Sequence, residues 1–376
     1  MSKSEPTGLW LINRHYDLSF FVLPAFLGLL WLVPFYIYGP AAIFFIYVGQ
    51  SLVAGIPHLY VTWFSLASKE ALQNIQTRFV YGVGLAALVG TALIILYVGE
   101  WISNFLISLT FFLAGWHSHK QHLGMIKLYT YVQSERWQDS TIIEDTKALR
   151  WFYFFAMNVL FIFSFTRPEI TYQITAQRNI SLIYPKMPIE LLYAYVSLTV
   201  LIGLWALYRI FYVRRLVNKK PLPWPQLCLA ATTVSVATFM YLTLPPKAYM
   251  LLWIVPAFGH NIQYMAYVWL FERLRVRHIE KASQKPFPFS RLLKIVKNRR
   301  WFFYFFPAYL LTVFSLSLGS FGYELMAVAL IHFITIFHYI GDGFFWKKDI
   351  NQHAKPVTRL ILNYGSDSSI SPKSPA

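Results

Sequence analysis

Apolar runs as long as a bilayer is thick constrain this chain more than any other feature. A transmembrane helix needs about 20 consecutive apolar residues, and we find ten runs of roughly that length. They cover residues 18–38, 41–66, 80–98, 102–118, 150–166, 189–212, 224–245, 247–271, 301–320 and 321–346. We therefore expect an all-α fold: a polytopic integral membrane helix bundle with about ten transmembrane helices.

The composition supports one membrane domain followed by a short tail. The chain is 57% hydrophobic and only 13% charged, outside the usual range of a soluble domain. We expect residues 1–350 to form a single transmembrane helical domain and residues 351–376 a cytoplasmic, partly disordered tail. The polar start of the chain does not look like a cleavable signal, so we expect the first apolar run to stay as a span.

Lysine and arginine collect in alternate connections between the runs. The connections rich in lysine and arginine include 120–150, 214–220 and 273–300, whereas the intervening connections carry few basic residues. The positive-inside rule places the rich connections and both termini in the cytoplasm, in a bacterial cell at the inner membrane. The net charge of +17 then reflects orientation and attraction to anionic membrane lipids, and we expect no nucleic-acid partner.

Histidine is the chemically active residue type that this topology brings together. Of ten histidines, His278 and His353 fall in basic loops, which leaves eight in five segments at the cytoplasmic side. Polar groups inside a membrane are costly and often functional, so this convergence predicts a metal site facing the cytoplasm. The predicted metal ligands are His15, His58, His117, His119, His122, His260, His332 and His338.

The densest part of the pattern is "HSHKQH", residues 117–122. If the helix continues past residue 118, His119 and His122 lie about 60° apart on one face. His117 points away from them, and we expect it to need a bend to join the site. We expect the cluster to form an imidazole cage at the membrane surface.

Three further polar residues are predicted to support the metal ligands. In "HFITIFHYIGD", His338 and Asp342 share a polar helix face, so the Asp342 carboxylate would orient the His338 ring or be a second ligand. Gln263 and Tyr267 share a face with His260 at spacings of three and four residues. Asp342, Gln263 and Tyr267 are therefore candidates to contact the histidine ligands.

The donor atoms that the sequence offers limit which metal the site could bind. The single cysteine, Cys228, excludes a thiolate cluster, and an imidazole-rich site suits iron, zinc or copper. Catalytic zinc uses about three protein ligands, fewer than the eight histidines here. The zinc-protease motifs HExxH and HxxEH are absent. Iron is therefore the predicted cofactor, with zinc as the alternative.

The histidine pattern resembles integral-membrane fatty-acid desaturases, hydroxylases and alkane monooxygenases. The likeness rests on "HSHKQH", "HFITIFH" and the separate His15, His58 and His260, while the desaturase boxes HxxxH and HxxHH are absent. The carotene dioxygenases of the Brp/Blh type are a looser comparison. The resemblance implies non-haem iron, as one ion or a di-iron pair, and oxygen-dependent chemistry on a lipid or other hydrophobic substrate. A ferredoxin or cytochrome electron donor would dock on the basic segment 273–300.

Two other classes of function remain open from the sequence. A zinc-dependent lipid hydrolase, similar to the alkaline ceramidases, would need some of the histidines together with Asp342 or Asp17. A transporter or a haem-binding electron carrier would use opposed histidines without catalysis. The predicted function is a membrane-bound iron oxygenase, desaturase or hydroxylase.

Overall fold

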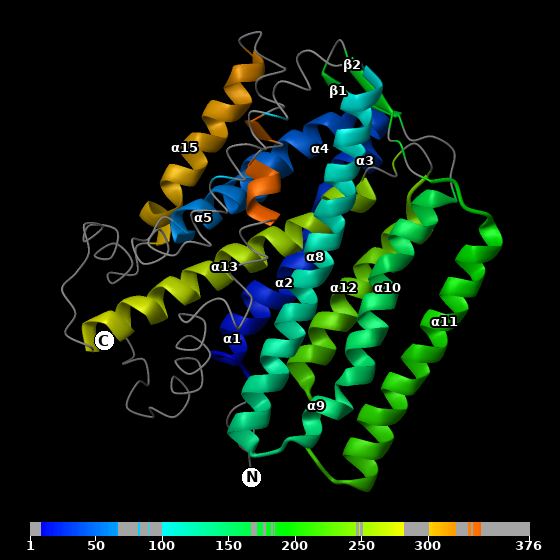
Figure 1. Ribbon diagram of the computed structural model, residues 1–376, viewed down its shortest axis with the longest axis vertical. Helices are drawn as coiled ribbons and strands as arrows, with labels where there is room; N and C mark the ends of the chain where they lie inside the picture. The colour runs from blue at the N-terminus through cyan, green and yellow to red at the C-terminus, as the bar shows by residue number, and fades with distance from the viewer. Residues whose placement is uncertain are drawn as a thin grey trace.

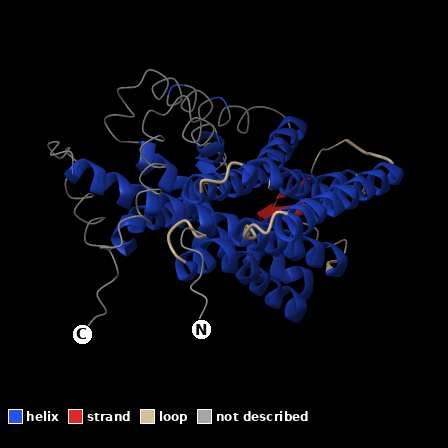
Figure 2. Cartoon of the chain, turned by 90° about the horizontal axis from the view of Figure 1, so that it is seen from below, coloured by secondary structure: helices blue, strands red, loops and turns tan. Residues whose placement is uncertain are grey.

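The computed structural model is a bundle of helices that run mostly along its long axis, crossed obliquely by one long helix (Figure 1). It describes residues 9–66, 100–166, 171–175, 178–181, 185–245, 251–281, 301–320, 330–331 and 334–339, with a few single residues between them. Figure 2 views the chain along this axis and shows helices throughout with one pair of strands. The helical expectation is confirmed for these residues.

The elements follow the apolar runs of the sequence closely. The α-helices are α1 (Arg14–Asp17), α2 (Leu23–Leu27), α3 (Leu32–Tyr38), α4 (Ala42–Gln50), α5 (Ile56–Leu66), α8 (Glu100–Trp137), α9 (Thr141–Asp145), α10 (Lys147–Phe165), α11 (Ile189–Leu207), α12 (Trp224–Thr243), α13 (Leu251–Lys281) and α15 (Trp301–Ser320). Short π or 3₁₀ turns join or extend them: η1 (Leu18–Val22), η2 (Gly28–Trp31), η3 (Gly39–Ala41), η4 (Ser51–Gly55) and η5 (Tyr208–Val217). Strands β1 (Thr171–Thr175) and β2 (Arg178–Ser181) form an antiparallel hairpin that the sequence did not predict.

Four stretches of the described helices are long and apolar enough to cross a membrane. They are Arg14–Ala41, Thr141–Phe165, Ile189–Val217 and Trp224–Thr243, and Phe45–Val61 and Phe305–Leu318 are shorter apolar helices. Large apolar side chains stand exposed on them, such as Leu201 and Leu204 on α11. Such a surface is stable against lipid and not against water, so the chain is a membrane protein. The predicted span 80–98, apart from Gly82 and Gly90, and the tail 351–376 lie outside the described residues.

Helix α8 is the longest element and continues well past its predicted end at residue 118. It has 38 residues, about 57 Å at 1.5 Å per residue, against a hydrocarbon core of about 30 Å. His122, Ile126, Tyr129 and Gln133 on its second half are buried in the bundle. The "HSHKQH" cluster is therefore in the middle of a packed helix.

The chain is pinned to the second half of α8 just before its first helix begins. The Gln133 amide donates to the Leu9 carbonyl at 2.8 Å, and Arg136 donates to the carbonyls of the next two residues. The buried Asp17 carboxylate accepts from the Leu11 amide at 2.7 Å and from the Tyr129 hydroxyl at 2.8 Å. These bonds fix the start of α1 against the same end of the bundle as α9.

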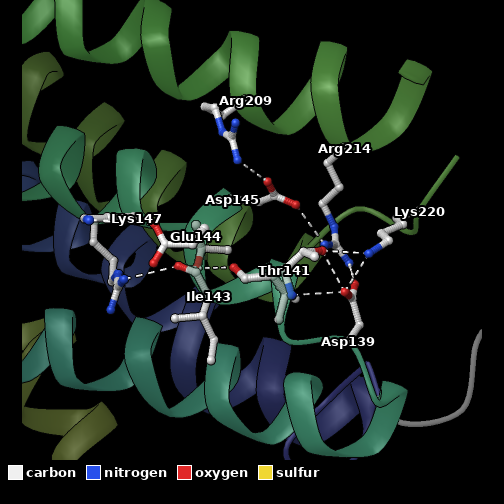
Figure 3. A network of polar contacts seen from close by, with 12 residues as sticks. Asp139, Thr141, Ile143, Glu144, Asp145, Lys147, Arg209, Arg214 and Lys220 are labelled. Atoms are coloured by element: carbon white, nitrogen blue, oxygen red, sulfur yellow. Dashed lines mark hydrogen bonds and ion pairs between the residues drawn. The ribbon is translucent and has the colours of Figure 1, made fainter. Parts of the chain in front are cut away.

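A network of ion pairs closes that end of the bundle (Figure 3). The Arg214 guanidinium is fully buried and contacts Asp145 at 3.1 Å and Asp139 at 3.0 Å, while Arg209 and Lys220 contact the same two carboxylates. Burial alone would raise the pKa of Asp139, but hydrogen bonds from Lys220, Thr141 and Arg214 outweigh burial and hold its pKa at about 2. The carboxylate is therefore charged at neutral pH and compensates the buried guanidinium, which would otherwise be costly.

Helix α2 and the turn η2 that continues it cross α13 in unusually close contact, and two glycines make this possible. A Cβ on Gly259 would lie 2.8 Å from the Ala25 Cα, and one on Gly28 would lie 2.6 Å from the Val255 carbonyl oxygen. Both obstacles are backbone atoms, which cannot rotate aside. This crossing sets the position of α13, and His260 follows Gly259 directly in the sequence.

We predict that Gly259→Ala lowers the free energy of unfolding by about 1–3 kcal/mol, the usual cost of overpacking a tight contact. Gly124→Ala on α8 is the matched control, because no atom lies within 4 Å of its added Cβ. The better helix propensity of alanine should leave that control unchanged or about 0.5–1 kcal/mol more stable. Thermal unfolding in detergent measures both variants, and equal stability of the two would contradict the account of this crossing.

Candidate metal centre

Three buried histidines from distant parts of the chain meet inside the bundle. His58 lies on α5, His260 on α13 and His338 in the helical segment 334–339, and all three are buried. One ring nitrogen of each lies within 4.8 Å of the corresponding atoms of the other two. Three imidazoles at this distance, in an apolar interior, are a candidate metal site.

His117 is the fourth member of this group. Its Nε2 lies 3.1 Å from the Nε2 of His338, and its ring centroid is 5.4 Å from that of His260. Two nitrogens bound to one ion at about 2.1 Å lie about 3.0–3.4 Å apart for bond angles of 90–109°. The spacing of His117 and His338 therefore fits two ligands of one metal ion. We refer to His58, His117, His260 and His338 as the four-histidine centre.

The backbone around His58 fixes which ring nitrogen faces the centre. The π turn η4 precedes α5, and the His58 Nδ1 bonds to the Gly55 carbonyl. A neutral imidazole that donates from Nδ1 keeps a lone pair on Nε2, the form that binds metal. The carbonyl–histidine contact thus prepares His58 as a ligand.

Proline makes this local geometry possible, and a tyrosine stabilises it. Pro57 has no N–H to donate to the Val53 carbonyl four residues earlier. The Tyr309 hydroxyl of α15 donates to that carbonyl at 2.9 Å instead. Helix α15 therefore helps to hold the irregular turn that orients His58.

The chemistry of the centre also fits a metal better than a set of packing residues. The His260 Nδ1 is buried without a hydrogen-bond partner among the described residues, and such a group costs about 1–3 kcal/mol if left unpaired. All four candidate donors are imidazoles, which suits iron, zinc or copper. A bound divalent ion would satisfy lone pairs that otherwise face one another.

Two tyrosines form the wall of the centre. The Tyr264 ring is 5.8 Å from that of His58 and 5.1 Å from that of His338, and the Tyr339 ring stacks on His117 at 4.7 Å. Tyr339 belongs to the polar face expected from "HFITIFHYIGD", but Tyr264 was missed. Its spacing of four residues from His260 is the sequence signal that could have identified it.

The predicted ligands do not all reach the four-histidine centre. His119 packs against Phe161, whereas His122 lies between Tyr153 and His260. The role of His119 and His122 as metal ligands stays a prediction. His117 reaches the centre without a bend, because α8 is one continuous helix and the His338 ring approaches His117 directly.

The remaining predicted residues have different positions. His15 is exposed on α1, and no described contact brings it to the centre. Gln263 is buried beside His122, and Tyr267 is buried about two turns from His260. His332 and Asp342 lie outside the described residues, so their predicted roles stay predictions.

Comparison with known proteins gives no match to a family model, to a characterised protein or to a solved structure. The resemblance to membrane oxygenases therefore stays a prediction, and the functional argument depends on the site alone.

We predict that metal-free protein in detergent binds one Co²⁺ at the four-histidine centre, detected by the visible absorption of the bound ion. His58→Ala, His260→Ala and His338→Ala should each lose most of this binding, because each removes one of few ligands. His15→Ala is the control and should bind normally, since His15 is exposed. Full cobalt binding by properly folded His338→Ala would rule out this centre.

Proposed function

We propose that the protein is a membrane-embedded, non-haem iron oxygenase that acts on a hydrophobic substrate. The observation that carries this proposal is the four-histidine centre, with three buried imidazoles within 4.8 Å and a fourth at 3.1 Å from His338. An iron ion held by these ligands would supply the activation of molecular oxygen. The hydrophobic substrates that this proposal covers include lipids and terpenoids.

The donor set favours this function over a zinc lipid hydrolase. The metal-binding group among the described residues contains imidazoles and no carboxylate. Zinc-dependent hydrolysis commonly needs a carboxylate or histidine that is free to accept a proton from water. Asp17, the described candidate for that role, already accepts hydrogen bonds from Leu11 and Tyr129.

The protein's own residues would position the ion and keep water away from it. Tyr264, Phe337 and Val61 are almost fully buried on the elements that carry the ligands, so the surroundings are apolar. A substrate dissolved in the bilayer would approach laterally between helices. If one oxygen atom enters the substrate, a ferredoxin or cytochrome must supply two electrons, whereas a dioxygenation takes them from the substrate.

We further propose about ten spans with both termini and the 273–300 segment in the cytoplasm. The ion network joins the basic turn at Arg214 and Lys220 to Asp139, and residues 9–11 are pinned near the same end by Gln133 and Arg136. The hairpin is at the opposite end (Figure 1). This arrangement supports the orientation expected from the positive-inside rule, at the inner membrane in a bacterial cell.

The experiment combines metal analysis with oxygen labelling. Protein purified after growth with iron should contain iron in simple stoichiometry, and Mössbauer spectra would distinguish one ion from a di-iron pair. Cells expressing the wild type under ¹⁸O₂ should form a labelled hydrophobic product that is absent with His338→Ala. Stoichiometric zinc without iron, or the same products from both proteins, would contradict the oxygenase proposal.

A further inference from the structure

Cations gather on the surface of the bundle where α8 and α10 pack side by side. Lys120, Gly124 and Lys127 follow one another on α8 at spacings of four and three residues, and all three are exposed. Arg150 of α10 is half-buried beside them. Burial, and then the charges of Arg150 and Lys120, lower the pKa of Lys127. We call Lys120, Gly124, Lys127 and Arg150 the cationic face.

The protein supplies little negative charge to the cationic face. Glu144 attracts Arg150, but it also pairs with Lys147 at 3.7 Å. The Arg150 guanidinium donates to the Ile143 carbonyl at 3.3 Å, which carries no charge. The other ion pairs among the described residues belong to Arg209, Arg214 and Lys220. An anion from outside the chain would therefore be attracted by three cations at once.

The surface between the two lysines has room for such an anion. No atom lies within 4 Å of a Cβ built on Gly124. An anionic group can therefore approach the α8 backbone at this glycine, and the flexible side chains of Lys120 and Lys127 can reach it from either side. Because the cationic face is on the surface, binding there needs no cavity inside the bundle.

The cationic face lies at the boundary between apolar and polar surface. The apolar part of α10 begins at Trp151, directly after Arg150, and α10 belongs to one of the stretches that can cross a membrane. The apolar run of α8 ends at residue 118, just before Lys120. The two helices lie alongside each other (Figure 1). Both apolar surfaces therefore end at the same level, where lipid headgroups meet water.

Two tryptophans lie at this boundary. The Lys120 Nζ is 4.9 Å from the ring centroid of Trp116, whose ring is 5.7 Å from that of Phe154 on α10. The Trp151 ring is 6.1 Å from the same phenylalanine, and Trp151 is 48% exposed. Tryptophan is enriched at the headgroup level of membranes. An apolar surface that acyl chains could contact thus adjoins the cations.

We propose that the cationic face binds the phosphate of an anionic phospholipid, whose acyl chains lie against the apolar surface of α8 and α10. The phosphate lies over Gly124 and accepts hydrogen bonds from Lys120, Lys127 and Arg150. A zwitterionic phospholipid brings a second, positive group that these cations repel. The proposal depends on the chain being a membrane protein, and neither a metal ion nor the oxygenase function enters it.

The test measures how much radiolabelled dioleoylphosphatidylglycerol the immobilised protein retains in detergent. Unlabelled dioleoylphosphatidylglycerol should compete about tenfold better than dioleoylphosphatidylcholine, which has the same chains and no net charge. Lys120→Gln combined with Lys127→Gln should remove most of this preference. Equal competition by the two lipids against the wild type would overturn the proposal. Displacement of the label by millimolar inorganic phosphate would show a site for free phosphate and would also overturn it.

Two further variants separate the cationic face from general attraction of anions. Arg215→Gln combined with Lys219→Gln removes two other exposed cations and should keep the wild-type preference. If it loses as much preference as the Lys120 and Lys127 pair, the effect is one of total charge and the proposal fails. Gly124→Leu keeps every charge but fills the space between the lysines, so it should weaken binding of the anionic lipid about tenfold. Wild-type binding by this variant would exclude a phosphate over Gly124.

Discussion

The convergence of imidazoles in an apolar interior is the interaction on which the rest of the structure depends. His58, His260 and His338 are all buried, and a buried imidazole is stable only when its two nitrogens find partners. The Gly55 carbonyl accepts a hydrogen bond from the Nδ1 of His58. A metal ion is the partner that would satisfy several remaining lone pairs at once.

The surrounding helices can be understood as the means of holding those rings. The α2–α13 crossing depends on Gly28 and Gly259, because a Cβ on either would meet backbone atoms. The irregular turn before His58 leaves the Val53 carbonyl to the Tyr309 hydroxyl. His58 and His260 are therefore each supported by a local feature of this kind, and irregular helix turns like the one before His58 are frequent at functional sites.

The sequence predicted the helical membrane fold and which histidines converge. It was less informative about which rings each of these histidines contacts. Apolar length alone identified the helices, since bilayer thickness fixes that length. It did not show where α8 ends, because residues 119–137 mix polar and apolar positions and become buried only through contacts with other helices. A helical wheel compared His117 with His119 and His122 on one helix. It could not show that His338 would approach His117.

Other features required three-dimensional information for the same reason. Tyr264 has the right spacing from His260, but nothing in the sequence says that its ring also meets His58 and His338. The positions of the His122 and Gln263 side chains depend on bonds to the Ser118 and Phe21 carbonyls. Backbone carbonyls are present at every residue, so their use by side chains leaves no mark in the composition.

X-ray absorption at the iron edge of the iron-loaded protein tests the central claim most directly. The account predicts a first shell that includes about four nitrogen scatterers at roughly 2.0–2.2 Å, with the outer-shell pattern of imidazole and no sulfur. A first shell of oxygen without imidazole scattering, or one containing sulfur, would contradict a four-histidine centre.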